Sequence, residues 1–180
     1  MKKYNFLSLL IFAASLTLSI SSCLSDDEHF IDFSNIGVVV DIPQSANYGI
    51  ADNQTFTISK TPTPYSFDVK VEAPTKTLSN IDIVLSVDKA YLPPFNAANN
   101  KTYLLLPDST FSISNGTVTV PAGKELGAFT INFMTNKIDT AIASDPTKGY
   151  ALPITIMSAS NGVIPSANYG TKVIVVSVKK

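Results

Sequence analysis

Residues 102–133 have the sequence TYLLLPDSTFSISNGTVTVPAGKELGAFTINF, and this stretch decides the fold class. Asn115-Gly116 predicts a hairpin, because both residues tolerate a positive φ, and Pro121-Ala122-Gly123 ends the second strand. On either side of these turns, apolar residues alternate with polar or small ones, as is typical of strands with one buried face: Phe111, Ile113, Val118, Val120, Phe129, Ile131 and Phe133. The stretch predicts a β-meander, in which consecutive strands pair with one another.

The same pattern extends to both sides of the meander. Further strands are expected at residues 37–42, 55–59, 65–72, 81–87, 102–106, 150–157 and 173–178. No long helix is predicted: residues 88–92 allow one helical turn, which Pro93-Pro94 would stop, and residues 136–149 are expected to form a polar loop. Short strands separated by Pro and Gly indicate an all-β fold, an antiparallel β-sandwich over residues 36–180.

The composition restricts the class of function. The 180 residues are 45% hydrophobic and 15% charged, as expected for one domain with an ordinary core. All 13 basic residues are lysines, and removal of a signal that contains Lys2 and Lys3 leaves 11 of them against 14 acidic residues, a net charge of −3. This balance excludes nucleic acid as a partner. The lack of arginine and tryptophan removes the side chains best suited to gripping phosphate and to stacking on sugars.

The N-terminus has the features of an export signal followed by a lipid anchor. Residues 1–22 begin with two lysines and continue with a short apolar core. Ile20-Ser21-Ser22-Cys23 resembles a lipobox, in which a branched residue and two small residues precede the cysteine that is acylated. An unpaired thiol in an oxidising compartment would otherwise need its own explanation. We expect Cys23, the only cysteine, to anchor the mature protein to a membrane through palmitate and related acyl chains.

Residues 23–35 form the expected acidic tether between the anchor and the domain. Asp26-Asp27-Glu28 resembles the signal that carries lipoproteins of the Bacteroidota to the outer face of the outer membrane, with Ser25 in place of the usual lysine or glutamine. The alternative is a solvated spacer without a targeting role. The expected location is the outer membrane facing the cell exterior, with its periplasmic face as the alternative.

A pentapeptide occurs twice in the domain. Ser45-Ala46-Asn47-Tyr48-Gly49 recurs as Ser166-Ala167-Asn168-Tyr169-Gly170, and each copy lies shortly after an Ile-Pro dipeptide and before a predicted strand. One interpretation is that the same turn is used twice, since asparagine and glycine both tolerate a left-handed backbone. The other is that the two tyrosines form a platform for a ligand.

Convergent catalytic groups are not evident in the sequence. His29, the only histidine, lies in the tether, where no rigid scaffold holds it against a serine. The carboxylates of the domain alternate with apolar strand residues and are interpreted as solvated groups rather than a glycosidase pair. Asp139 and Asp145 lack the dense ligand spacing of a calcium loop. No catalytic residue, metal site or cofactor is predicted, and the protein is expected not to be an enzyme.

Several strand and turn motifs follow the lipobox in a fixed order: Phe95-Asn96, Tyr103 with Leu105-Leu106-Pro107, residues 118–123 (VTVPAG) and residues 150–154 (YALPI). They resemble a Bacteroidota lipoprotein family whose N-terminal β-sandwich domain has no known function. Members occur in glycan-utilisation loci, and some carry the domain ahead of a family 18 glycoside hydrolase domain. The resemblance, which spans residues 36–178, implies an immunoglobulin-like sandwich at the cell surface that is accessory to glycan capture. Longer members continue past the position of Lys180, so no catalytic domain is expected to follow.

The leading functional prediction is a surface-anchored, non-enzymatic module that binds glycan or a neighbouring outer-membrane lipoprotein through its loops. Tyr48, Tyr91 and Tyr169 are the expected ligand contacts, because a tyrosine presents both an apolar ring and a hydroxyl. Tyr103 and Tyr150 lie in predicted strands and are assigned to the core. The alternative is an adhesin or pilus-like subunit that pairs an edge strand, above all residues 172–178, with another chain.

Two tripeptides resemble the acceptor pattern of the general O-glycosylation system of exported Bacteroidota proteins. They are Asp108-Ser109-Thr110 and Asp139-Thr140-Ala141. The alternative is that both are ordinary turn sequences. We predict that at least one of Ser109 and Thr140 carries a glycan, which would cover that end of the sandwich.

Overall fold

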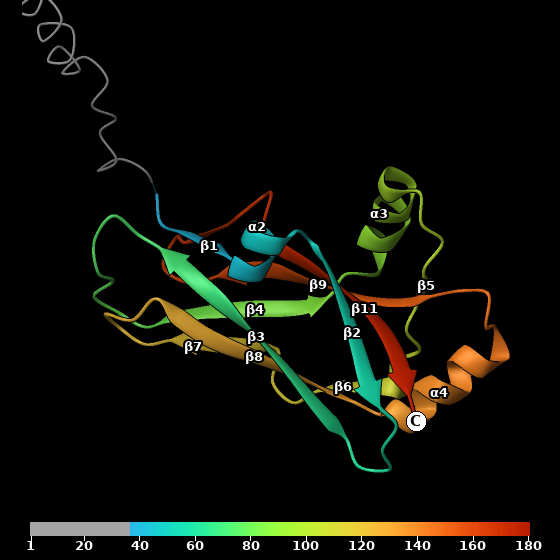
Figure 1. Cartoon of the computed structure of the whole chain (residues 1–180). Coiled ribbons are helices and arrows are strands. Elements are labelled where there is room, and N and C mark those ends of the chain that lie inside the picture. The colour runs from blue at the N-terminus through green and yellow to red at the C-terminus, as the bar shows by residue number, and fades with distance from the viewer. Residues whose placement is uncertain (1–36) are drawn as a thin grey trace, which may run out of the picture. The chain divides into compact units, whose positions relative to one another are not determined.

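Strands make up most of the regular structure of residues 37–180, the part of the chain that the computed structural model describes (Figure 1). The five-stranded sheet, sheet A, has the order β10 (Ile164–Pro165), β1 (Val39–Asp41), β3 (Thr63–Glu72), β8 (Leu126–Phe133) and β6 (Phe111–Ile113). The six-stranded sheet, sheet B, has the order β2 (Ala51–Thr57), β11 (Thr171–Lys179), β9 (Tyr150–Ala159), β4 (Ile81–Val87) and β7 (Thr117–Val120), with β5 (Leu104–Leu105) also paired to β9. The all-β sandwich predicted from the sequence is confirmed.

The core is built from the inward faces of both sheets. Side chains alternate between the two faces of a strand, so every second residue can enter the core. From sheet A, β3 and β8 bury Phe67, Val69, Val71, Phe129, Ile131 and Phe133. From sheet B, β4 and β9 bury Ile81, Ile83, Leu85, Leu152, Ile154 and Ile156 in the same cluster. The prediction that residues 65–72 and 81–87 form half-buried strands is confirmed.

Strand direction is mixed at the edges of the sandwich. The central pairs β3–β8, β4–β9 and β9–β11 are antiparallel, as expected. The pairs β1–β10, β2–β11 and β5–β9 are parallel. Parallel partners need long crossover connections, so they come from segments that are distant in the sequence, and no local pattern reveals them.

The prediction that residues 172–178 form an edge strand is wrong. These residues belong to β11, which lies between β2 and β9 and pairs with β9 over residues 171–176 and with β2 over residues 173–179. The sequence pattern shows that the strand is apolar, but it does not show how many neighbours the strand has. The edge-strand pairing considered for a pilus-like subunit therefore cannot use this strand, because it already has a neighbour on each side.

The predicted meander is also wrong, although its strands exist. β6 pairs with β8 in sheet A, whereas β7 pairs with β4 in sheet B, so Asn115-Gly116 carries the chain from one sheet to the other. Period-two alternation marks one buried face, and that face is the same for strands that pair and for strands that face each other across a core. The two sheets approach closely there, because a Cβ atom placed on Gly127 of β8 would lie 2.4 Å from Val118 Cγ1 of β7.

Three α-helices lie where the sequence predicted a loop or no helix. Residues 136–149, expected to be a polar loop, contain most of helix α4 (Thr135–Ser144), which buries Ile138 in the core. Pro93-Pro94 do not stop a helix but lie in the first turn of α3 (Leu92–Asn99), where proline needs no N–H partner. Helix α2 (Pro43–Tyr48) and the 3₁₀ helix η4 (Asp108–Thr110) were not predicted, whereas the 3₁₀ helix η3 (Lys89–Tyr91) confirms the helical turn expected at residues 88–92.

The export signal, Cys23 and the acidic tether lie outside the described residues, so their predictions stand on the sequence. Within residues 37–180, none of the helices has the length and apolar character needed to span a bilayer.

A tyrosine-lined groove as the candidate functional site

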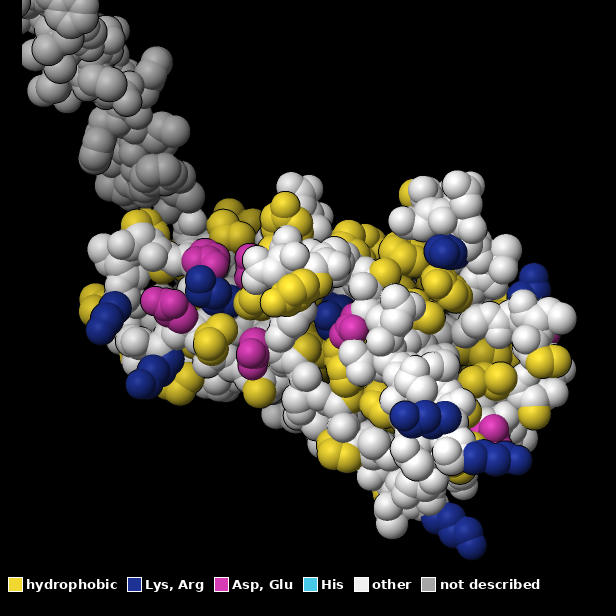
Figure 2. Space-filling model, in the orientation of Figure 1, with side chains coloured by type: hydrophobic (Ala, Val, Ile, Leu, Met, Phe, Trp, Pro, Cys, Tyr) yellow, Lys and Arg dark blue, Asp and Glu magenta, His cyan; other side chains and the backbone are white. Residues whose placement is uncertain are grey.

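A groove of about 700 Å³ opens between helix α2 on one side and η3 with α3 on the other. The start of β2 and the turn before β11 complete its walls. Hydrophobic side chains gather on the face between α2 and α3 (Figure 2). The large side chains that line the groove are Tyr48, Ile50, Tyr91, Pro94, Phe95 and Tyr169. All three tyrosines that the sequence suggested as ligand contacts therefore lie at one site.

The two copies of the pentapeptide form one wall of the groove, but they do so with different backbones. The first four residues of the first copy lie in helix α2, and Gly49 follows as its C-cap residue with φ = 87°, a value that favours glycine. The second copy is a turn, in which the Ser166 hydroxyl accepts a hydrogen bond from the Tyr169 N–H at 3.2 Å. The prediction that one turn is used twice is therefore wrong.

Backbone and side-chain hydrogen bonds join the segment around the first copy to the segment around the second. The Ile42 N–H, at the N-cap of α2, donates to the Tyr169 carbonyl oxygen at 2.9 Å. The buried Ser45 hydroxyl donates to the Thr171 carbonyl oxygen at 2.8 Å. These contacts set the spacing of Tyr48 and Tyr169, whose side chains remain 84% and 42% exposed. The exposed rings are available to a ligand, since the contacts that hold them use other atoms.

The opposite wall is a small second core on the outer face of sheet B. Leu92 and Phe95 of α3 pack on Ala151 of β9 and Val173 of β11. The Phe95 ring stacks on Tyr91, with ring centres 6.4 Å apart, and on Tyr103, with centres 6.5 Å apart. This packing holds the Tyr91 ring in place, as is needed for a ring on which a ligand stacks.

Polar contacts fix the segments that carry this wall. The Asp88 carboxylate accepts a hydrogen bond from the Ala90 N–H at 3.1 Å and so caps η3. The Asn96 side-chain amide donates to the Tyr103 carbonyl oxygen at 2.8 Å and accepts from its N–H at 3.2 Å. Burial, with a smaller contribution from the charge of Asp88, raises the pKa of Tyr91. Its hydroxyl therefore remains protonated and able to donate at neutral pH.

A recess of about 130 Å³ adjoins the groove and shares Tyr48, Gly49 and Ala51 with it. Its other lining residues are Gln44, Asp52 and Lys172. Lys172 is only 2% exposed, and its Nζ lies 3.1 Å from Asp52 Oδ2. No sequence signal points to this buried pair, because the two residues belong to parallel strands that are far apart in the chain.

Asp52 is held in its charged form by three donors. It accepts hydrogen bonds from the Tyr65 hydroxyl and the Lys172 ammonium group, and from Gln54 Nε2 at 2.7 Å. Burial acts to raise the pKa of Asp52, but the hydrogen bonds from Tyr65, Gln54 and Lys172 outweigh it, and the pKa is lowered. Burial, together with the hydrogen bond to Asp52 and the charge of that carboxylate, raises the pKa of Tyr65. The recess therefore contains a charge-balanced pair rather than a free charge.

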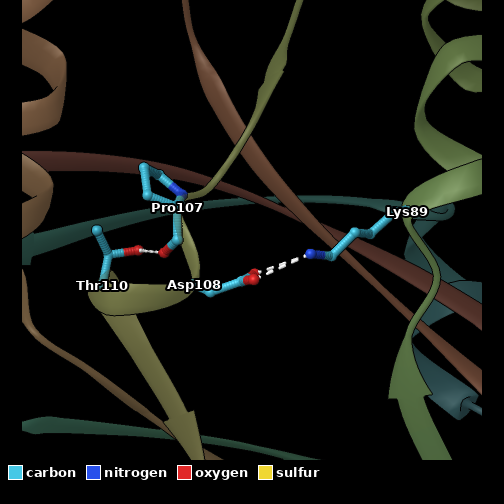
Figure 3. A network of polar contacts seen from close by, with 4 residues as sticks. All are labelled: Lys89, Pro107, Asp108 and Thr110. Atoms are coloured by element: carbon cyan, nitrogen blue, oxygen red, sulfur yellow. Dashed lines mark hydrogen bonds and ion pairs between the residues drawn. The ribbon is translucent and has the colours of Figure 1, made fainter.

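The candidate glycosylation sites lie away from the groove. Ser109 is exposed in η4, between Asp108, which binds the Lys89 ammonium at 3.0 Å, and the buried Thr110, whose hydroxyl donates to the Pro107 carbonyl oxygen at 2.6 Å (Figure 3). Thr140 is exposed within helix α4, where its hydroxyl donates to the Asn136 carbonyl oxygen at 3.1 Å. Of the two tyrosines assigned to the core, Tyr150 is buried and Tyr103 is half-buried just before β5.

Comparisons with known proteins identify the domain type. A family model whose description is “-like, N-terminal domain” matches residues 33–163. A search of curated protein sequences gives no match.

Solved structures from Bacteroides have the same fold. A Bacteroides ovatus protein proposed to bind carbohydrate is 16% identical, with a TM-score of 0.60 over 77% of this chain and 36% of its own. A second Bacteroides ovatus protein, of unknown function, is 20% identical, with a TM-score of 0.61 over 79% of this chain and 47% of its own. EndoBT-3987 of Bacteroides thetaiotamicron, crystallised with a Man5GlcNAc product, is 18% identical, with a TM-score of 0.58 over 77% of this chain and 30% of its own.

This chain spans less than half the length of each of these three proteins, and at these identities the likeness shows the fold. The family model, in contrast, matches most of the chain. The chain belongs to the family of N-terminal β-sandwich domains that this model describes, in agreement with the motifs in its sequence.

Proposed function

We propose that the protein is a non-enzymatic glycan-binding module, accessory to glycan utilisation and attached to the outer membrane through Cys23. The observation that carries this proposal is the convergence of Tyr48, Tyr91 and Tyr169 on one groove. Glycan as the class of ligand is supported by the structurally similar proteins named above, since one is proposed to bind carbohydrate and another was crystallised with an oligosaccharide product.

The chemistry of the groove suits a sugar. The apolar C–H face of a pyranose packs on an aromatic ring, while its hydroxyls need hydrogen-bonding groups at the edge, and tyrosine offers both. The groove is concave and mostly apolar, with a few polar groups, as ligand sites usually are. The lack of tryptophan leaves tyrosine as the aromatic residue with a polar group, and three tyrosines lie at this site.

The proposed anchor agrees with this role. An acylated Cys23 would place the domain at the end of a short acidic tether, within reach of extracellular glycan if the lipoprotein faces outward. The groove is formed by helices and turns on a packed sandwich, so binding requires little ordering of the protein.

A binding measurement on matched variants tests the proposal. Full-length protein in detergent is screened on an oligosaccharide array, and affinities for the best ligands are measured by calorimetry. We expect Tyr48→Ala with Tyr169→Ala to weaken binding at least about tenfold, as loss of central aromatic contacts does in other interfaces. Leu78→Ala is the control, because Leu78 is 98% exposed and lies outside the groove. Equal binding by the double tyrosine variant and the control would contradict the proposal.

A further inference from the structure

We infer that the recess formed by Gln44, Tyr48, Gly49, Ala51, Asp52 and Lys172 is a subsite that binds a hydroxyl group of an uncharged sugar. This inference rests on the proposed glycan-binding role of the groove. It adds a specificity for neutral over acidic glycans, which the three tyrosines alone do not provide.

Lys172 is a donor with spare capacity at this site. On β11 it is two residues from Ile174, so both side chains point toward the interior, and only 2% of Lys172 is exposed. An ammonium group has three N–H donors. Among the described residues Nζ has one partner, the Asp52 carboxylate at 3.1 Å. Donors are thus left for a ligand oxygen that enters the recess.

Gln44 supplies an acceptor without a partner. Its Oε1 atom is buried and forms no hydrogen bond with any described residue. A buried polar atom of this kind costs about 1–3 kcal/mol if it stays unpaired. The terminal torsion of glutamine is broad, so the amide can turn toward a group in the recess. A sugar hydroxyl satisfies both residues, because it donates to an oxygen and accepts from an ammonium group.

Charge and size select the ligand group. Asp52 is ionised and neutralises Lys172, so a carboxylate brought into the recess would meet a pair that is already balanced and would lie close to a like charge. A neutral hydroxyl avoids this repulsion. The recess, at about 130 Å³, holds several times the ~30 Å³ that one water occupies, which is enough for a hydroxyl or hydroxymethyl group with its carbon.

A glutamine variant and a surface control separate this subsite from the rest of the groove. Gln44→Leu removes the unpaired acceptor and should leave the melting temperature unchanged or higher, while it weakens binding of neutral oligosaccharides about tenfold. Leu78→Ala is the control, because Leu78 is 98% exposed and lines neither the groove nor the recess. We expect Leu78→Ala to bind within about twofold of wild type.

The test uses full-length protein in detergent on an array in which each neutral oligosaccharide is printed beside its form oxidised to a carboxylate at C6. We expect wild-type protein to prefer the neutral members at least about tenfold and Gln44→Leu to lose affinity for them. If Gln44→Leu binds as wild type does, or if the oxidised members bind equally well, the subsite is overturned while the groove proposal stands. If no member binds, or if the tyrosine variants bind normally, the groove proposal fails and the subsite with it.

Discussion

The Ile42 N–H donates a 2.9 Å hydrogen bond to the carbonyl oxygen of Tyr169, although the two residues come from opposite ends of the domain sequence. Ile42 is the N-cap residue of helix α2, and Tyr169 lies in the turn before β11. The bond therefore joins the first helix of the domain to the turn before its last strand, at one wall of the groove. Hydrogen bonds between these two segments therefore contribute both to the stability of the domain and to the position of Tyr48 and Tyr169 in the groove.

Ser45→Ala should destabilise the protein by about 1–2 kcal/mol, because it leaves the Thr171 carbonyl oxygen without the buried hydroxyl that bonds to it. Ser166→Ala changes the equivalent serine of the second pentapeptide copy, where the hydroxyl accepts a longer bond at a more exposed position. We expect the second change to cost less than about 1 kcal/mol. Urea unfolding of both variants checks the order, and equal losses would contradict it.

Gly123→Val should destabilise the domain by about 1–3 kcal/mol through backbone strain, since Gly123 has φ = 73° and no atom lies near its missing Cβ. Gly127→Ala should cost a similar amount for a different reason, which is the clash with Val118. Only the second loss should be recovered by adding Val118→Ala. Thermal unfolding distinguishes the two cases, and an unchanged melting temperature for Gly123→Val would show that the turn does not need glycine.

The acid dependence of stability should report on Asp52 and Asp41 with opposite signs. The pKa of Asp52 is lowered in the folded protein, so its charge stabilises the fold above the unfolded pKa near 3.8, and this contribution is lost as the pH falls through the folded value. The pKa of Asp41 is raised, by burial and by the nearby Glu72 charge, and one of its carboxylate oxygens is buried without a partner. Its charge therefore opposes folding at neutral pH, and protonation removes the penalty.

Urea unfolding between pH 7 and pH 3 tests this contrast. Asp52→Asn should be less stable than wild type at pH 7, where it leaves Lys172 buried without a carboxylate, and the difference should shrink below about pH 4. Asp41→Asn should match or exceed wild-type stability at pH 7 and lose that advantage as the pH falls. If Asp41→Asn is less stable than wild type at pH 7, the charged carboxylate of Asp41 stabilises the fold and the expectation is wrong.

Cys23 is predicted to be acylated and to be the first residue of the mature protein. Labelling of growing cells with a palmitate analogue should mark the wild-type protein, and Cys23→Ser should lose the label, because the lipid is attached through this sulfur. A variant labelled as strongly as wild type would place the anchor elsewhere.

Modification is predicted at Ser109 in preference to Thr140. Ser109 lies in a single 3₁₀ turn, whereas Thr140 lies within helix α4 with its hydroxyl bonded to the preceding turn. A transferase must reach the hydroxyl and the residues that flank it, which a short turn permits more readily than a helix. Intact-mass measurement of protein from the native host should show a sugar increment that Ser109→Ala abolishes and Thr140→Ala retains. A mass equal to polypeptide plus lipid would contradict any modification.

The sequence alone determined the elements that depend on short-range pattern. Alternation predicted β3 and β4 with the residues that each buries, because the two faces of a strand differ in their contact with solvent. Gly123 was correctly placed in a turn that uses its backbone freedom, with φ = 73°, whereas Asn115-Gly116 lies in a connection but has neither the positive φ nor the hairpin predicted for it. The motifs around Phe95, Tyr103 and Tyr150 identified the family, which its model confirms.

Tertiary structure decided everything that depends on partners distant in the chain. Alternation is the same for strands that pair and for strands that face each other, so the assignment of β6 and β7 to different sheets could not be read from it. Helix α4 was interpreted as a loop because most of its residues are polar or small, but Ile138 is buried in the core and Ala141 and Ile142 pack against it. The groove itself exists because β2 pairs in parallel with β11, which brings Tyr48 beside Tyr169 and Asp52 beside Lys172. Such contacts follow from the packing of the whole chain, and no single stretch encodes them.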